Sequence, residues 1–322
     1  MNRGLPAALA GFLLLSGCAH YAQFTLPLLT GGDPSLTFTF EMRPEPVLTP
    51  ASGEALNPSV VRADRLLNFY SEFDGRTWRT VLATSPDGLD WRRERTLVEP
   101  DPRTWEGSYI AANGSALPWN NEPWYWYQAG PKASPRIGLW HARKLPQPVV
   151  GYGPYMSWDE RAVADPYVIR LGRYFYLYYL GQDRADPPRQ RLGLARSTDG
   201  VHWEKLRSNP VLDLDDEAGI GEPAVFQFHG FYWMLYTARH RDETRDLRLA
   251  RSLDGVRWRK MPAVFAGTAV WDSKVICDPT VLVEGDTIRV WFGGGDVARP
   301  DENIHGRIGY GILHPVHATL AP

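Results

Sequence analysis

The 322-residue sequence has few cysteines, no long apolar run and no excess of charge of one sign. Its two cysteines, Cys18 and Cys277, cannot build a disulfide scaffold. Its 35 basic and 37 acidic residues leave a net charge of −2, which gives no electrostatic case for a nucleic-acid partner. Its apolar runs are too short to span a bilayer, and no sustained helical stripe occurs. These absences favour a β-rich globular chain.

A nine-residue pattern, Ala-x-Ser-x-Asp-Gly-x-x-Trp, recurs at residues 83–91, 195–203 and 250–258. Ser85 and Ser197 are 112 residues apart, and Ser197 and Ser252 are 55 apart, so one degenerate copy must lie in the first gap. Runs of aromatic and β-branched residues bounded by Gly, Asp and Pro predict short strands between the copies. A period of this length, built of strands and tight turns, is typical of a propeller blade.

A polar residue, called here the head, opens each repeat before an apolar run. Successive heads are spaced by 56, 52, 57 and 56 residues, and they are Asn57, Asn113, Asp165, Glu222 and Asp278. Because there are five heads, we predict an all-β, five-bladed propeller with four-stranded antiparallel blades over residues 46–322. We expect each head to start the innermost strand of its blade.

The first residues predict a targeting segment. Arg3 precedes a short apolar stretch, and residues 15–18 (Leu-Ser-Gly-Cys) resemble the lipobox of bacterial lipoproteins. We therefore predict a signal peptide over residues 1–17, a lipidated Cys18 and a membrane-anchored location in the bacterial cell envelope, at the outer membrane. A cleaved ordinary signal peptide with an incidental cysteine is the alternative. Residues 18–45 are predicted to form a tether, in which Leu36–Phe40 is a strand that closes the ring.

The innermost strands of a propeller start near its axis, so the heads should meet in one funnel. Three heads are carboxylates: Asp165, Glu222 and Asp278. Cleavage of a glycoside needs a carboxylic acid that protonates the leaving oxygen and a second group that activates water or attacks the sugar. Crowding of carboxylates also raises the pKa of whichever is most buried. The sequence therefore predicts catalysis in the funnel.

Other residues are candidates for binding the sugar. Asn57 and Asn113 are heads, and a histidine, His305, precedes the third strand of the fifth blade. Tryptophans that precede a head by seven or eight residues are predicted at the funnel mouth as stacking platforms, with core packing as the alternative: Trp105, Trp158 and Trp271. We expect a carbohydrate ligand, a monomer and no cofactor or metal, and an ion on the axis stays open. Cys277 is expected to be a small buried residue rather than a nucleophile.

The order of the heads, the repeated turns and the segment Gly221–Phe226 resemble the five-bladed glycoside hydrolases of families 43, 32 and 68, with family 130 as a further relative. The resemblance spans residues 46–313. It implies that Asp165 tunes and orients the reacting groups and that Glu222 is the general acid. Family 43 has an aspartate as general base on blade one, where this chain has Asn57. An amide cannot accept the proton, so the simple inverting mechanism lacks its base.

Three interpretations of Asn57 follow. Another carboxylate, Asp278 or Glu106, serves as the base. Alternatively, the protein is a phosphorylase similar to members of family 130, with phosphate as the attacking group and basic candidates at Arg62, Arg170, Arg239 and Arg307. Finally, the protein binds glycans without cleaving them. Hydrolysis is favoured, because an exported protein meets abundant water and little phosphate.

The aspartates of the repeated turns resemble a sialidase Asp-box. Asp87, Asp199 and Asp254 each stand before a glycine in a tight turn. Such an aspartate bonds the local backbone while the glycine takes positive φ, so a structural role is predicted on the outer rim.

Overall fold

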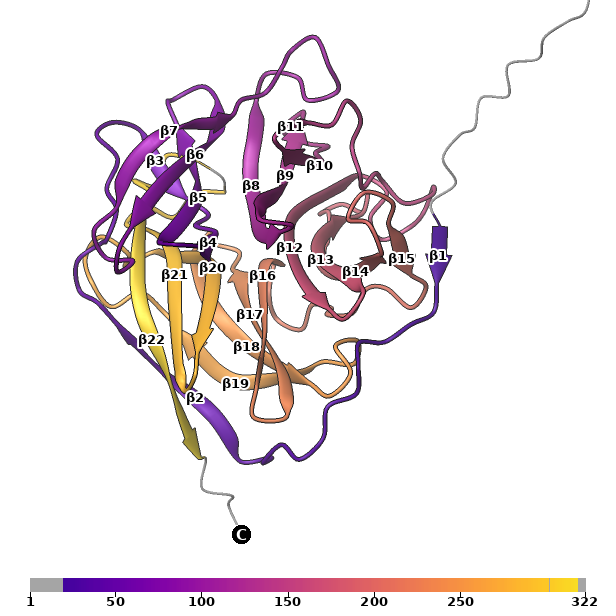
Figure 1. Cartoon of the computed structure of the whole chain (residues 1–322), viewed down its shortest axis with the longest axis vertical. Helices are drawn as coiled ribbons and strands as arrows, with labels where there is room; N and C mark the ends of the chain where they lie inside the picture. Colours follow the sequence, from indigo (N-terminus) through magenta and orange to yellow (C-terminus); the bar gives the residue numbers. More distant parts are fainter. Residues whose placement is uncertain (1–19, 301, 318–322) are drawn as a thin grey trace, which may run out of the picture.

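The computed structural model describes residues 20–300 and 302–317, and these form five blades around a central axis (Figure 1). Within this part of the chain no helix is long and apolar enough to cross a membrane. The predicted signal peptide and Cys18 lie outside the described residues. The all-β, five-bladed fold predicted from the repeat is confirmed.

Each blade is an antiparallel meander that runs outward from the axis. The strands of the first three blades are β3 (Glu54–Leu56), β4 (Val60–Arg62), β5 (Leu66–Phe73), β6 (Trp78–Ser85) and β7 (Arg92–Val98) in blade one, β8 (Ile110–Trp119), β9 (Glu122–Gly130), β10 (Arg136–His141) and β11 (Arg143–Lys144) in blade two, and β12 (Ala162–Leu171), β13 (Tyr174–Gln182), β14 (Gln190–Ser197) and β15 (Glu204–Leu206) in blade three.

Blade five takes its outermost strand from the N-terminal part of the chain. The strands of the last two blades are β16 (Gly219–Phe228), β17 (Phe231–Arg239), β18 (Arg245–Ser252) and β19 (Arg259–Phe265) in blade four, and β20 (Val275–Glu284), β21 (Thr287–Gly295), β22 (Arg307–His317) and β2 (Leu36–Met42) in blade five.

The cores of the fold lie between neighbouring blades. The second strand of each blade is buried along most of its length, because its two faces pack on two blades. Large rings fill these interfaces, and Trp126, Trp233 and Trp291 are fully buried. An aromatic run without alternation of polar residues is the sequence signal of such a strand. Most of the tryptophans therefore serve the core, as expected from their number.

The N-terminal part of the chain closes the ring. Strand β2 pairs antiparallel with β22 along its whole length, in the place that the sequence suggested for a ring-closing strand. The residues before it are held to the propeller, which differs from the predicted tether. Strand β1 (His20–Ala22) pairs in parallel with β15, and the side chains of Phe24 and Leu26 are buried against blades three and four. Figure 1 shows this segment passing along the outside of the blades from β1 to β2.

The repeated turns have the predicted structural role. Asp87 Oδ1 accepts hydrogen bonds from the backbone amides of Leu89 and Asp90, at 2.9 and 3.2 Å. Gly88 has a φ of +84°, and a Cβ atom there would lie 2.5 Å from the ring of Trp291. The Trp291 indole donates to the Gly88 carbonyl oxygen at 2.7 Å, so the turn of blade one locks onto blade five. The resemblance to a sialidase motif therefore carries no active site.

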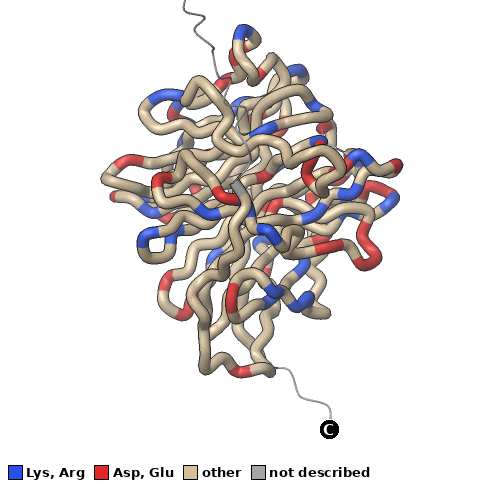
Figure 2. The backbone as a smooth tube through the Cα atoms, turned by 90° about the vertical axis from the view of Figure 1, so that its right-hand side faces the viewer, with Lys and Arg blue, Asp and Glu red and all other residues tan. Residues whose placement is uncertain are grey.

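Basic and acidic residues are interspersed over the surface (Figure 2). No large region of one sign stands out in that view, in keeping with the small net charge of −2. A charged ligand must therefore be bound by individual charged side chains and not by a broad surface of one sign.

Candidate active site

Four of the heads lie in a β-bulge of an innermost strand, and the fifth, Asn57, lies between β3 and β4. In β12, Ala164 pairs with Leu180 and Tyr167 with Tyr178, so that Asp165 and Pro166 together face a single residue of β13. The same irregularity occurs at the heads of β8, β16 and β20. A bulge bends its strand and re-aims a side chain. The heads were expected to start these strands, but each is the fourth residue, because the strand begins at the pocket rim and bulges where it meets the axis.

The backbone at the heads is strained. All of them have φ between 46° and 53°, a region that non-glycine residues rarely adopt: Asn57, Asn113, Asp165, Glu222 and Asp278. All but Asn113 also precede a proline, which disfavours this conformation further. Such strain costs about 1–3 kcal/mol per residue and is concentrated at functional sites. Its repetition around the axis supports a functional role for the head side chains.

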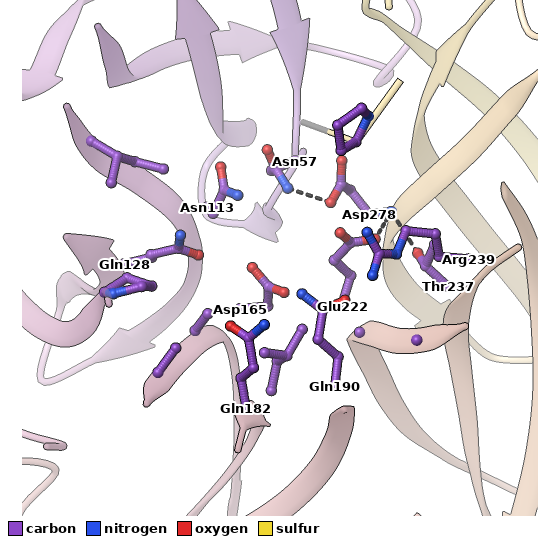
Figure 3. Close-up of a pocket in the computed structure, with 18 of the residues that line it drawn as sticks. Asn57, Asn113, Gln128, Asp165, Gln182, Gln190, Glu222, Thr237, Arg239 and Asp278 are labelled. Atoms are coloured by element: carbon purple, nitrogen blue, oxygen red, sulfur yellow. Dashed lines mark hydrogen bonds between the residues drawn. The ribbon is translucent and has the colours of Figure 1, made fainter. Parts of the chain in front are cut away.

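The heads line one open pocket at the end of the axis (Figure 3). Its walls come from the ends of second strands and the beginnings of third strands. Their polar side chains are Gln128, Gln182, Gln190, Thr237, Arg239 and Arg245. Amide and hydroxyl groups around three carboxylates are the groups that bind sugar hydroxyls.

Small residues on the innermost strand make room for these walls. Thr237 pairs with Gly221 and Arg239 with Gly219 in the register of β16 and β17. A Cβ atom on Gly219 would lie 2.7 Å from Gln190 Oε1. Both glycines are paired in β16, and their lack of a side chain provides this space.

Asp278 is a buried funnel carboxyl with a raised pKa. It is 6% exposed, its Oδ1 accepts a hydrogen bond from Asn57 Nδ2, and its Oδ2 accepts one from Cys277 Sγ at 3.0 Å. Burial, and next the charge of Glu222, raise the pKa of Asp278 well above its usual range. A carboxylate oxygen of Glu222 lies within 4.8 Å of one of Asp278, and Glu222 Oε2 accepts from the Asp278 amide at 3.3 Å. The carboxylate of Glu222 is therefore close enough to disfavour ionisation of Asp278.

The same group could be considered for a metal ion, because the sulfur of Cys277 also lies within 4.8 Å of both carboxylates. The donors fit this role poorly. Burial raises the pKa of the Cys277 thiol well above its ordinary value, and metals bind the thiolate. Both oxygens of Asp278 already accept hydrogen bonds from Asn57 and Cys277. Cys277 is therefore a buried thiol.

Comparison with known proteins agrees with this architecture. The model of the glycosyl hydrolases family 32 N-terminal domain matches residues 67–277, which is more than half of the chain. The chain belongs to this family. Its fold is that of the five-bladed β-propeller glycoside hydrolases.

Solved structures resemble this family 32 protein along most of its length. One, described as a glycoside hydrolase, has a TM-score of 0.71 and 17% identity, and the match covers 93% of this chain and 95% of that one. Another is the catalytic domain of the family 62 α-L-arabinofuranosidase of Coprinopsis cinerea, with a TM-score of 0.64 and 15% identity over 87% of this chain and 98% of that one. At such identities the likeness shows the fold.

Two sequence relatives match over shorter segments. An uncharacterized protein of Mycobacterium tuberculosis, MT1551, is 31% identical over 156 residues, or 45% of this chain and 52% of its own length. The 1,2-β-oligomannan phosphorylase of Thermoanaerobacter sp. (strain X514) is 29% identical over 119 residues, or 34% of this chain and 40% of its own. The chain thus spans about half the length of the mycobacterial relative.

The three tryptophans predicted at the funnel mouth do not line the pocket, and that prediction is wrong. Each indole packs instead on a glycine of a neighbouring strand: Trp105 on Gly138, Trp158 on Gly181 and Gly193, and Trp271 on Gly294 and Gly309. A glycine leaves a ring-sized space between strands, and filling it buries a large apolar surface. The core-packing alternative therefore holds for these residues.

Glu106 and His305 also lie outside the residues that line the pocket. The side chain of Glu106 is buried, bonded to Tyr127 Oη at 2.6 Å and to Lys144 Nζ at 2.5 Å. It is a structural ion pair within blade two and cannot serve as the base. His305 is exposed and its Nδ1 lies 2.6 Å from Asp296.

The arginines considered as phosphate-binding residues also differ in whether they line the pocket. Arg62 pairs with Glu284, and Arg170 stacks on Trp119 at 3.9 Å. Arg239 lines the pocket, whereas Arg307 is not among the lining residues. The pocket adds Arg245, which the sequence analysis missed.

The missed wall residues, Arg245 and the three glutamines, had a positional signal. They stand near the end of a second strand or at the start of a third. Small residues shortly before a head, such as Ala162 and Gly219, mark the places where such side chains reach the pocket.

Proposed function

We propose that this protein cleaves glycosidic bonds in its funnel, with the Glu222–Asp278 pair as the source of the proton. The observation that carries the proposal is the buried Asp278, whose pKa is raised by burial and by Glu222, in contact with a pocket lined by two further carboxylates. Pairs of carboxyls whose environments favour different protonation states divide acid and base roles between them.

The side chain of Glu222 is more exposed than that of Asp278, so it is the member of the pair that meets the substrate. Glu222 donates a proton to the leaving glycosidic oxygen, and Asp278 supplies the proton to it across a gap that one water molecule can bridge. This retains Glu222 as the acid and gives Asp278 the role of a proton store.

The second group that glycosidase chemistry requires is assigned to Asp165. Asn57 cannot accept a proton, Glu106 is outside the pocket, and Asp278 holds its proton. Figure 3 shows Asp165 entering the cavity from the blade next to Glu222. Asp165 is then assigned to activate water or to stabilise positive charge on the sugar.

The test compares amide variants on two kinds of substrate. Glu222→Gln should lower turnover of natural glycosides by about 10²–10⁴-fold, and much less on an aryl glycoside whose leaving group needs no protonation. Asp165→Asn should lower turnover of both. Asp286→Asn is the matched control, because that side chain is 92% exposed and is not among the residues that line the pocket.

Unchanged natural turnover in Glu222→Gln would refute the acid assignment. If the wild type binds glycans and cleaves none across a broad panel, the protein is a glycan-binding protein that has lost catalysis. Asn57 on blade one is the observation that favours this alternative.

Phosphorolysis is the second candidate. A relative is named as a phosphorylase, and Arg239 lines the pocket. Added inorganic phosphate would then raise turnover and yield a sugar phosphate, whereas hydrolysis would be indifferent to it.

We also propose that the protein is anchored in the bacterial cell envelope by acyl chains on Cys18. The support is the sequence Leu-Ser-Gly-Cys at residues 15–18. His20, two residues further, is already held in β1, so such an anchor would keep the outer edge of blade three close to the membrane. Cys18→Ala should release the protein from membrane fractions, and a variant that fractionates like the wild type would contradict the anchor.

A further inference from the structure

Two arginines stand opposite each other on the wall of the pocket. Arg239 ends β17 and Arg245 begins β18, and the two are direct partners in the register of this strand pair. Both line the pocket. Like charges directly opposite each other on neighbouring strands are destabilising. An anion placed between these two side chains, called here the arginine pair, would relieve this repulsion.

The surroundings hold the arginine pair toward the pocket. Arg245 is 9% exposed, and its Nη2 donates to the carbonyl oxygens of Arg299, at 2.8 Å, and of Pro300. These contacts fix the plane of its guanidinium group. Arg239 reaches Glu243 only through a long contact of 3.5 Å, and its buried Nε–H has no hydrogen-bond partner among the described residues.

Neighbouring polar groups complete the site. Gly219 lies between Gln190 and Arg239, with its Cβ position 2.7 Å from the amide oxygen of Gln190 and 3.5 Å from Arg239 Nε. An amide beside a guanidinium group can bind a sugar hydroxyl next to a charged substituent. Lys132, another basic residue of the pocket, already pairs with Glu302 at 2.8 Å and is not part of this site.

We infer that the arginine pair binds the carboxylate of an acidic sugar, so that the substrate is a uronic-acid-containing glycan. A guanidinium fork matches a planar carboxylate through two parallel hydrogen bonds. A neutral sugar offers no charge to bridge the pair. Free phosphate would carry up to two charges into a pocket that also holds Glu222 and Asp165, whereas a uronate carries one and is tethered to the ring. This inference rests on the proposed action on glycans.

Direct binding tests it without any need for turnover. Short oligouronides of galacturonic and glucuronic acid, their neutral counterparts and inorganic phosphate are titrated into the full protein by calorimetry. We expect an oligouronide to bind at least about 10-fold more tightly than its neutral counterpart, and less tightly as salt is added.

The variants localise the effect. Arg239→Gln should weaken oligouronide binding about 10- to 100-fold and leave binding of neutral sugars unchanged. Arg239→Lys should lose part of the affinity for the oligouronide, because lysine keeps the positive charge but cannot make the two parallel hydrogen bonds of a guanidinium group. Arg103→Gln is the matched control, since Arg103 is 87% exposed and pairs only with Asp101 among the described residues. Melting curves establish that each variant is folded.

Equal binding of acidic and neutral sugars, or equal effects of Arg239→Gln and Arg103→Gln, would overturn the inference. Binding of phosphate alone at the arginine pair would overturn it in favour of phosphorolysis. If oligouronides bind through Arg239 and are never cleaved, this inference stands and the proposed glycosidase activity fails. If neutral glycosides are cleaved without a preference for uronides, the reverse holds.

Discussion

Replacement of Asp278 by asparagine should stabilise the protein at neutral and alkaline pH while it abolishes activity. The folded-state pKa of Asp278 is raised, by burial first and by Glu222 second, so folding disfavours its ionisation. Its destabilising effect is absent below the unfolded pKa of about 4 and grows as pH rises toward the folded value. The asparagine oxygen can still accept the hydrogen bond of Asn57, so the amide fits the site.

The size of the gain follows from the distance between the two charges. Two unit charges at 4.8 Å, the upper limit of the closest Glu222–Asp278 separation, repel by about 3 kcal/mol at an effective dielectric constant of 20. For a chain of this length, each kcal/mol of added stability raises Tm by about 2 °C. Thermal unfolding of the wild type and Asp278→Asn from pH 4 to pH 9 measures the difference in Tm between the two proteins.

The difference in Tm should be near zero at pH 4 and several degrees at pH 8. Because the repulsion needs both charges, the gain should shrink in a Glu222→Gln background. A difference that is constant with pH, or a loss of stability that grows with pH, would refute the reasoning. Asp286→Asn, with a 92% exposed side chain, should show no comparable trend.

Three further predictions concern the framework around the site. Lys205→Met should lower the free energy of unfolding, measured in urea, by about 3–5 kcal/mol. The reason is that Asp159, which is fully buried and 2.5 Å from Lys205, would lose the charge that pairs with it. A double variant with Asp159→Asn should recover part of the lost stability. Asp272→Asn should stabilise the protein by about 1–2 kcal/mol at pH 7 and not at pH 4. Burial raises the pKa of Asp272, and its Oδ2 has no hydrogen-bond partner in the part of the chain described. An equal effect at both pH values would contradict this prediction. Phe38→Ala should cost about 3–5 kcal/mol, because this buried ring of β2 packs edge-on against Trp233 at 4.8 Å, and a loss below about 1 kcal/mol would show that the ring-closing strand contributes little.

The fold could be predicted because its signal is repeated. The spacing of Asn57, Asn113, Asp165, Glu222 and Asp278 is a property of the chain alone, and each blade must bury its faces on its neighbours. The convergence of the heads follows from the same topology. Their positive φ and the bulge do not, because a head followed by proline also fits an ordinary strand start.

The predictions that were wrong depend on where side chains point, and the spacing of residues along the sequence does not determine this. Trp158 precedes Asp165 by seven residues, and a chain of that length can bring its ring to the mouth of the pocket or fold it back onto Gly181. Glu106 was a candidate base by type, yet its lysine partner, Lys144, is 38 residues away in sequence, and their contact follows only from the fold. The arginine pair has the same origin, since strand register placed Arg245 against Arg239.

The backbone of the heads accepts different residues, and this separates chemistry from fold in the funnel. Asparagine and aspartate tolerate positive φ better than most residues do, so a head can change between them at little conformational cost. Asn57 therefore changes the chemistry of the funnel more than its shape. An aspartate at that position would place a carboxylate against Asp278, whereas the amide donates to Asp278 Oδ1 and orients it. Asn57 thereby helps Asp278 to hold its place beside Glu222, and in the proposed mechanism the acid–base work belongs to blades three to five.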